Sequence, residues 1–155
     1  MKGDEKIIQR LNERLSEELT AINQYMVHSE MCAGWGYEKL HKEIEKRAID
    51  EMKHAEKLIE RVIFLEGIPI VSSLKKVYIG STVELMHQND RKAEEDAIKA
   101  YNDDIKFVSE IKDNGTKELL HSILKDEESH IDRLEEYLDQ IKQMGLQVYL
   151  STYKD

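Results

Sequence analysis

Residues 50–54, Asp50-Glu51-Met52-Lys53-His54, return 76 positions later as Asp126-Glu127-Glu128-Ser129-His130. A second phrase repeats at the same offset, with Glu18, Ala21, Ile22 and Tyr25 matched by Glu94, Ala97, Ile98 and Tyr101. Repetition at a fixed offset indicates one structural unit used twice. Because most of the shared side chains are carboxylates, imidazoles and phenols, the sequence predicts two halves that build one polar site together.

Around these phrases, apolar residues recur at three- and four-residue steps, which is the pattern of amphipathic helices. A first helix is expected over about residues 5–33, before Gly34-Trp35-Gly36, and a second over about residues 38–65, before Gly67 and Pro69. Ser81 and Glu84 resemble a capping box that opens a third helix. The third helix continues through Val108, Asp113-Asn114-Gly115 marks a turn, and a fourth helix spans about residues 116–144.

The segment between the second and third helices shows no helical period and is about 15 residues long, at 66–80. Fully extended it reaches roughly 50 Å, enough to run the length of a helix of about 28 residues. We therefore expect an all-α four-helix bundle with one long crossover and an inverted second hairpin. The tail over residues 146–153 is expected to add a short C-terminal helix, and the whole chain, 1–155, is expected to be one domain.

Composition narrows the classes of function. The chain is 35% charged with a single proline, which favours long solvated helices, and its net charge of −9 argues against a nucleic-acid surface. One cysteine, Cys32, excludes an intramolecular disulfide framework. The first six residues lack the apolar region of a signal peptide, and no segment has the length and apolarity of a membrane span. We expect a cytoplasmic protein with no membrane or nucleic-acid partner.

The repeated phrases carry metal-ligand spacing. On a helix, Glu51 with His54 and Glu127 with His130 each offer a carboxylate and an imidazole to one spot. A lone Glu-x-x-His is usually a solvated face, but two copies, each with a Glu 33 residues earlier, are a far stronger signal. A di-iron or di-manganese centre in a helical bundle takes its ligands from two Glu-x-x-His motifs and two further glutamates. The predicted ligands are Glu18, Glu51, His54, Glu94, Glu127 and His130.

Several residues near these ligands have two interpretations. Tyr25 and Tyr101 follow Glu18 and Glu94 by two helical turns, and they either pack in the core or orient a ligand carboxylate or supply an electron. Asp50 and Asp126 are either hydrogen-bond acceptors behind the ligands or surface charges. The histidines outside the repeat, His28, His41, His87 and His121, are expected to be surface or core residues.

Met52 breaks the repeat, because its counterpart is Glu128, and it points about 100° away from the ligand face. It shares an apolar stripe, expected to face out of the bundle, with neighbours on the first two helices. That stripe is either a hydrophobic dimer interface or the site of a thioether ligand to haem iron. The other members of the stripe are Leu19, Ile22, Asn23, Met26, Ala55, Glu56 and Ile59.

Over its whole length the chain resembles the bacterioferritin family. The resemblance rests on Met1-Lys2-Gly3-Asp4, Ala21-Ile22-Asn23-Gln24-Tyr25, residues 49–55 and 126–132, and Phe64-Leu65-Glu66-Gly67. It implies a ferritin-like bundle whose six ligands form a ferroxidase site, with Glu51 and Glu127 as bridging carboxylates. It further implies that Met52 from two subunits binds one haem b.

The resemblance also implies an activity and partners. Two Fe(II) would be oxidised together by oxygen or hydrogen peroxide, and the product stored as a ferric mineral. Twenty-four subunits would close into a hollow shell through two-fold dimers. A ferredoxin-type protein is a candidate reductant for the stored iron. Some members carry a histidine and aromatic residues where this chain has Lys46, Leu58 and Arg133. The resemblance therefore does not extend to an inner-surface iron site or to an electron route through those aromatic residues, because this chain has other residues at those positions.

Two other classes remain open at this point. One is a DNA-protecting ferritin-like protein, disfavoured by the lack of a basic tail or patch. The other is a di-iron bundle for electron transfer or oxidase chemistry without mineral storage. The second class is distinguished by mass, because a monomer or simple dimer cannot form a cage.

Overall fold

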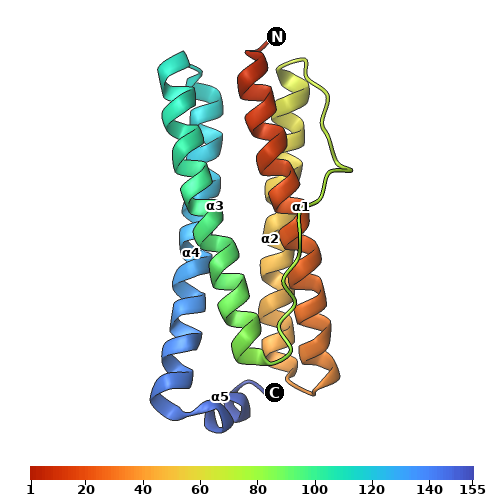
Figure 1. Cartoon of the computed structure of the whole chain (residues 1–155), viewed down its shortest axis with the longest axis vertical. Coiled ribbons are helices and arrows are strands. Elements are labelled where there is room, and N and C mark those ends of the chain that lie inside the picture. Colours follow the sequence, from red (N-terminus) through yellow and green to blue (C-terminus); the bar gives the residue numbers. More distant parts are fainter.

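A computed structural model describes residues 1–155 and contains five helices and no strands, as the periodicity predicts (Figure 1). Four helices are long and lie side by side, and a short fifth helix lies across one end. No helix has both the length and the apolar character that a bilayer span requires. The helices are α1 (Glu5–Gly34), α2 (Glu38–Phe64), α3 (Val83–Ile111), α4 (Asn114–Met144) and α5 (Leu146–Thr152).

The helix ends follow ordinary capping chemistry, with two corrections to the expected boundaries. Thr82, and not Ser81, is the N-cap of α3, because its hydroxyl accepts a hydrogen bond from the Leu85 N–H at 3.2 Å. The turn between α3 and α4 is tighter than expected, since Lys112 adopts left-handed backbone with φ 65° and Asp113 caps α4. Gly115 therefore lies inside α4 and not in the turn.

The chain forms two antiparallel hairpins, α1 with α2 and α3 with α4 (Figure 1). The segment from residue 65 to 82, which we call the crossover, leaves the end of α2 and descends along α1 to the opposite end of the bundle, where α3 begins. The second hairpin is therefore inverted relative to the first. This is the arrangement that the long connection predicts.

The crossover is irregular but firmly attached to α1. Every fourth residue on one face of α1 is polar, and each makes a hydrogen bond with the crossover backbone. Thr20 Oγ1, for example, accepts from the Lys75 N–H at 2.9 Å, and His28 Nε2 accepts from the Gly80 N–H at 2.9 Å. The members of this ladder are Asn12, Ser16, Thr20, Gln24 and His28.

The apolar core is split in two. One cluster, which includes Leu11, Leu58 and Ile123, fills the end of the bundle near the N-terminus. The other, which includes Ile44, Met86 and Leu134, fills the end near α5. Between the clusters lies a layer of buried carboxylates and imidazoles at the middle of all four long helices. Each apolar cluster thus closes one end of a polar compartment.

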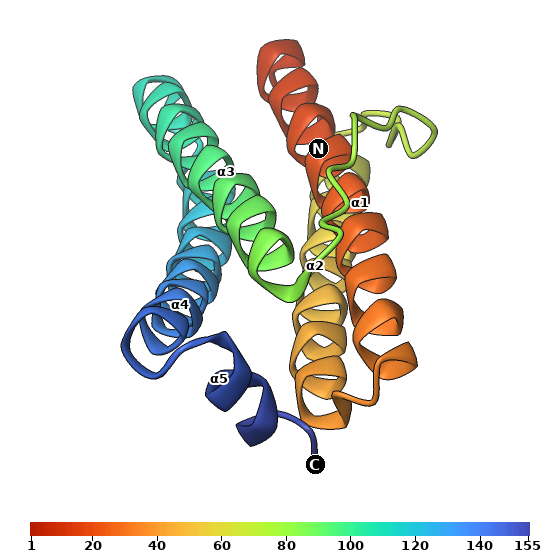
Figure 2. The same ribbon diagram turned by 60° about the horizontal axis from the view of Figure 1, so that its bottom comes forward.

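The short helix α5 closes the lower end of the bundle and brings the C-terminus close to the start of α2 (Figure 2). Its Tyr149 is fully buried, and the phenol lies 2.8 Å from His87 Nε2 on α3. The His87 ring also stacks on Tyr137 at 4.7 Å between ring centroids, and Tyr137 packs edge-on against Tyr153. The expected short C-terminal helix therefore forms, and aromatic side chains attach it.

Candidate metal centre

The middle layer brings together all six residues that the repeat singled out. Each long helix contributes at least one: Glu18 from α1, Glu51 and His54 from α2, Glu94 from α3, and Glu127 and His130 from α4. Five of them are 1–3% exposed, and the His130 side chain is 11% exposed. We call these six residues the candidate metal centre.

The candidate ligand atoms form two overlapping groups. One comprises Glu18, Glu51, His54 and Glu127, and the other comprises Glu51, Glu94, Glu127 and His130. Within each group the ligand atoms lie within 4.8 Å of one another. Glu51 and Glu127 belong to both groups, so their carboxylates lie between two positions that each also have one histidine and one further glutamate. This is the arrangement that two bridged metal ions require.

The donor atoms point inward and lack hydrogen-bond partners. Buried oxygens of Glu18, Glu51, Glu94 and Glu127 and the Nδ1 atoms of His54 and His130 are all unpaired. His54 Nδ1 lies 2.9 Å from Glu127 Oε1, and His130 Nδ1 lies 2.9 Å from Glu51 Oε1, without hydrogen-bond geometry. Buried unpaired polar atoms are costly, and six converging on one space fit a cation centre.

The other nitrogen of each histidine is held from behind. His54 Nε2 lies 2.9 Å from Asp126 Oδ2, and His130 Nε2 lies 3.1 Å from Asp50 Oδ2. With a proton on Nε2, each imidazole presents the Nδ1 lone pair to the centre, as in histidine metal ligands generally. The two aspartates thus lie behind the ligands as hydrogen-bond acceptors. Each supports the histidine of the other hairpin.

Two buried tyrosines, on α1 and α3, contact glutamates of the centre. Tyr25 donates to Glu94 Oε1 at 2.7 Å, and Tyr101 donates to Glu18 Oε1 at 2.5 Å. Each phenol therefore orients the carboxylate of the other half of the repeat. Both side chains are also 1% exposed and belong to the apolar clusters, so each has a packing and an orienting role.

Crowded carboxylates perturb one another strongly. Burial, followed by repulsion from Glu18 and Glu94, raises the pKa of Glu51 well above its ordinary value. Burial likewise raises the pKa of Glu127, again with neighbouring carboxylates adding to the effect. For Glu94 burial acts upward, but the close approach of Glu127 and of the His130 imidazole lowers its pKa to about 2. The metal-free centre thus holds protons that cations would displace.

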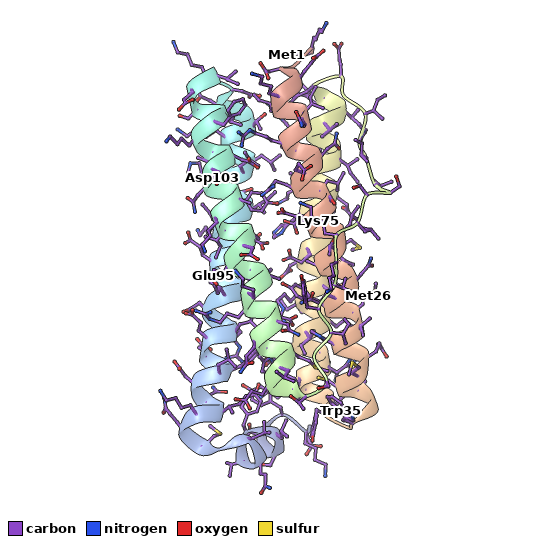
Figure 3. All side chains as sticks on the ribbon, viewed as in Figure 1. Met1, Met26, Trp35, Lys75, Glu95 and Asp103 are labelled. Carbon is purple, nitrogen blue, oxygen red and sulfur yellow. The ribbon has the colours of Figure 1, made fainter.

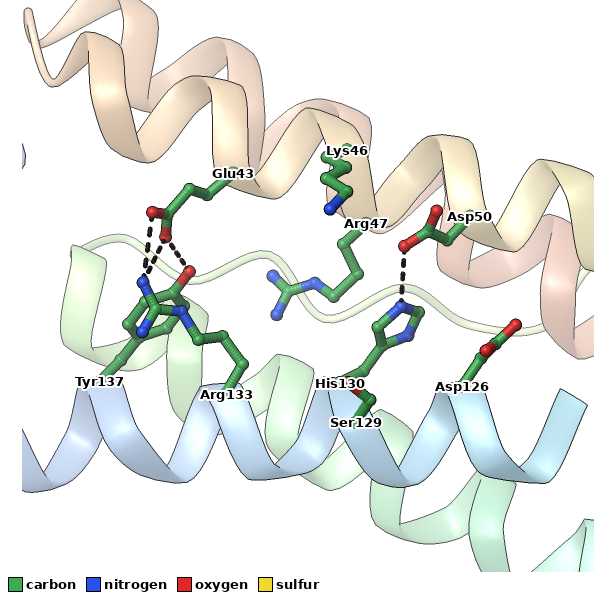
Figure 4. A pocket seen from close by; sticks show the side chains of 9 residues that line it. All are labelled: Glu43, Lys46, Arg47, Asp50, Asp126, Ser129, His130, Arg133 and Tyr137. Carbon is green, nitrogen blue, oxygen red and sulfur yellow. Dashed lines mark hydrogen bonds and ion pairs between the residues drawn. The ribbon is translucent and has the colours of Figure 1, made fainter.

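Two cavities approach the centre from opposite sides. One, of about 420 Å³, lies between α2 and α4 and ends at His130, with Asp50 and Asp126 on its walls (Figure 4). Lys46 lines this cavity, and Arg133 spans it to Glu43 at 3.2 Å. The other, of about 530 Å³, lies between α1, α3 and the crossover and ends at Glu18, Glu51, Glu94 and Glu127. We call the second one the crossover cavity.

Met52 lies away from the centre, on the surface of α2, with 45% of its area exposed. Met26 on α1 is also exposed, at 50%, whereas Ile59 is half-buried. One member of the expected outward stripe is wrong: Ala55 is only 4% exposed and packs in the core. The reason is geometric, because Ala55 lies one helical turn after the buried Glu51, on the same inward face of α2.

Behind Tyr25 lies a buried polar network that sequence reasoning missed. Asp90 is fully buried and accepts from Arg47 at 2.7 Å and from Gln24 at 2.8 Å, with His28 Nδ1 at 2.9 Å. The Arg47 guanidinium covers the Tyr25 ring at 4.5 Å. Arg47 and Asp90 lie outside the repeat, and the only signal in the sequence is that Gln24 and His28 belong to the polar ladder on α1.

Comparison with known proteins agrees with the geometry. The Ferritin-like domain family model matches residues 8–144. The chain is 40% identical to Bacterioferritin of Brucella melitensis over 96% of this chain and 92% of that protein. It is 41% identical to Bacterioferritin of Streptomyces coelicolor over 98% and 91%, and 39% identical to that of Rhodobacter capsulatus over 95% and 91%. Shared fold, near-complete alignment and identity at this level place the chain in the bacterioferritin family.

Proposed function

We propose that this protein is the subunit of an iron store and that it oxidises Fe(II) to Fe(III) at the candidate metal centre. Iron storage is the function that membership of the bacterioferritin family supports. The observation that carries the oxidation site is the pair of overlapping ligand groups that share Glu51 and Glu127. Two Fe(II) substrates held side by side deliver two electrons to oxygen or hydrogen peroxide together and avoid release of superoxide.

Each part of the chain has a defined task in this proposal. The carboxylates of Glu51 and Glu127 bridge the two ions, and Glu18 with His54 and Glu94 with His130 complete one position each. Asp126 and Asp50 fix the imidazoles with the Nδ1 lone pairs inward. Tyr25 and Tyr101 orient the terminal carboxylates. Burial leaves the ligand side chains little contact with bulk water apart from the cavities that lead to them.

Glu94→Ala tests the site. Removing the Glu94 carboxylate leaves one of the two metal positions with too few ligands. Oxygen-dependent Fe(II) oxidation should therefore slow by more than about tenfold, because even the loss of a residue that only hydrogen-bonds to a metal ligand has an effect of about this size. The initial rate is measured by stopped-flow absorption of Fe(III). Glu95→Ala removes the same charge from the exposed neighbour, 37% accessible, and is the matched control. An initial rate equal to that of the control rules out the assignment.

We further propose that Met52 binds haem b between two subunits, in a shell of twenty-four chains that holds a ferric mineral and is reduced by a ferredoxin-type protein. An exposed thioether on an apolar stripe supports this role, since a two-fold axis close to Met52 would bring two Met52 side chains together. Thioether sulfur is a known axial ligand to haem iron.

Met52→Leu separates haem binding from iron oxidation. Leucine keeps the volume and apolar character but has no lone pair for the iron, so the haem absorption band should disappear after reconstitution. The rate of Fe(II) oxidation should stay unchanged, because Met52 lies outside the candidate metal centre. A retained haem spectrum would contradict the axial-ligand proposal.

A further inference from the structure

The crossover cavity connects the surface to the candidate metal centre. Its floor is formed by carboxylates of the centre, and its walls come from α1, α3 and the crossover. Three lysines, Lys75, Lys76 and Lys92, lie on its lining. The four buried carboxylates at the floor of this cavity attract cations. The ammonium groups near the surface repel them at the rim.

Lys75 differs from the other two lysines in its partners. Its ammonium donates to Glu13 Oε2 at 3.1 Å and to Glu17 Oε1 at 3.3 Å. Glu13 and Glu17 are one helical turn apart on α1, so their carboxylates lie on one face and hold the ammonium between them. Glu17 lines the cavity and directly precedes Glu18 of the candidate metal centre.

The position of Lys75 is fixed from both ends. Its backbone N–H donates to Thr20 Oγ1 on α1, and Figure 3 shows it where the crossover passes along that helix. The Lys75 side chain is 47% exposed, and the side chains of Glu13 and Glu17 are 54% and 30% exposed. Exposed ion pairs contribute little to stability, so stability alone does not account for this arrangement.

We propose that Glu13 and Glu17 are a capture pair for divalent cations at the mouth of the crossover cavity, and that Lys75 is the counter-ion which an entering cation displaces. This inference rests on the proposed function, for which it names an entry route. Glu17 has a second partner, Arg14 at 3.2 Å, which holds its other oxygen and keeps the carboxylate in place during the exchange. Lys75 thereby sets the rate of Fe(II) uptake without contacting the candidate metal centre.

Co(II) uptake tests the inference without any oxidation step. Metal-free assembled protein is mixed with Co(II) under nitrogen, and the visible Co(II) absorption gives the second-order rate. At about 0.01 M salt, where the screening length is about 30 Å, Lys75→Met should bind about three- to tenfold faster than the wild type. Glu17→Gln should bind more slowly, and Lys75→Met should accelerate uptake less in the Glu17→Gln background.

Two variants control for charge and for structure. Lys99→Met removes a lysine that pairs with Glu95 outside the cavity, and its rate should equal that of the wild type. Lys75→Arg keeps the positive charge and should also retain the wild-type rate. At about 1 M salt, where the screening length is about 3 Å, the advantage of Lys75→Met should vanish.

The outcomes are distinguishable from failure of the proposed function. If the wild type and variants all bind two Co(II) per chain but Lys75→Met is no faster than Lys99→Met, the capture pair is refuted and the centre stands. A gain that persists at high salt, or that Lys75→Arg shares, shows loosening of the crossover and also overturns the inference. If the wild type binds no Co(II), the proposed function itself fails.

Discussion

Each histidine of the candidate metal centre is held on its far side by an aspartate of the other hairpin. His54 on α2 meets Asp126 on α4, and His130 on α4 meets Asp50 on α2. Because each aspartate directly precedes the glutamate of its own Glu-x-x-His, one five-residue phrase supplies a ligand pair for the centre and the support for its partner. The two copies of the phrase are therefore mutually dependent.

Replacing Asp126 with Ala tests that dependence. Loss of the hydrogen bond frees the His54 ring and lowers its basicity, so affinity for Co(II) should fall by about tenfold, the lower end of the range for such partners. The lower end is expected because the Asp126 side chain is 53% exposed and water replaces part of its contribution. Affinity is measured by competition with a chelator. Asp132→Ala, at an exposed site of the same helix, should leave it unchanged.

For single residues, the repeat predicts which ligands come together but not which side chains hydrogen-bond to them. The common offset selects Glu18 over Glu17, since only the former has a carboxylate counterpart, and the structure brings all six selected residues together. The tyrosines remained ambiguous, because spacing along one helix cannot tell which helix a side chain reaches. Tyr25 contacts Glu94 on α3, a pairing that depends on how the two hairpins dock.

Among the elements, the crossover shows most clearly what local pattern omits. Its length predicts that it traverses the bundle, but its sequence has no period that fixes a path. The path is fixed instead by α1, where polar residues every fourth position accept or donate hydrogen bonds along it. These residues are as regular as an apolar stripe, so a search for polar periodicity at four-residue steps would have detected the ladder.

Helix α5 has an attachment that responds to pH. Burial, followed by the charges of Arg47 and His28, lowers the pKa of His87 to about 3, compared with about 6.5 in an unfolded chain. Above pH 6.5 both states are neutral and this group costs nothing. As the pH falls from 6.5 toward 3 only the unfolded chain gains the proton, so folding stability decreases by up to about 1.4 kcal/mol per pH unit.

His87→Gln should therefore flatten the acid side of the stability profile. Glutamine retains a hydrogen-bonding group for Tyr149 but does not take up the proton, so between pH 6.5 and 4.5 the variant should lose about 2 kcal/mol less stability than the wild type. Guanidinium unfolding at a fixed chain concentration measures the difference. His121→Gln makes the same exchange at an exposed position and should follow the wild type. Parallel curves for His87→Gln and wild type would exclude this role.

For the whole molecule, the sequence repeat and the pair of inverted hairpins correspond, because each copy of the repeat forms one hairpin. Equal offsets for Glu18 and Glu94 and for Glu51 and Glu127 are expected if both hairpins present the same face to a shared axis. The structure has this arrangement, with one apolar cluster on either side of the polar layer. What the sequence could not predict is the pair of cavities, because their walls combine residues from helices and the crossover that no single repeat unit contains.

The surface of the first hairpin bears on how chains assemble. Met26 and Met52 are half exposed, and Figure 3 shows Met26 at the outer side of α1, away from α3. Ile49, Met52 and Ile63 continue this apolar surface along one face of α2. Exposed apolar surface of this extent is typical of an interface. In a two-fold interface each residue near the axis meets its own copy.

Met52→Glu tests assembly and the haem proposal on the same residue. If two Met52 side chains meet at a two-fold axis, the change places two carboxylates face to face in an apolar contact, where like charges are strongly unfavourable. The variant should therefore elute as monomers, whereas Met52→Leu and the wild type should have the mass of twenty-four chains by light scattering. The variant chain should stay folded, since residue 52 is 45% exposed. A full-sized Met52→Glu cage would place Met52 away from the axis and leave haem binding between two such residues without a geometry.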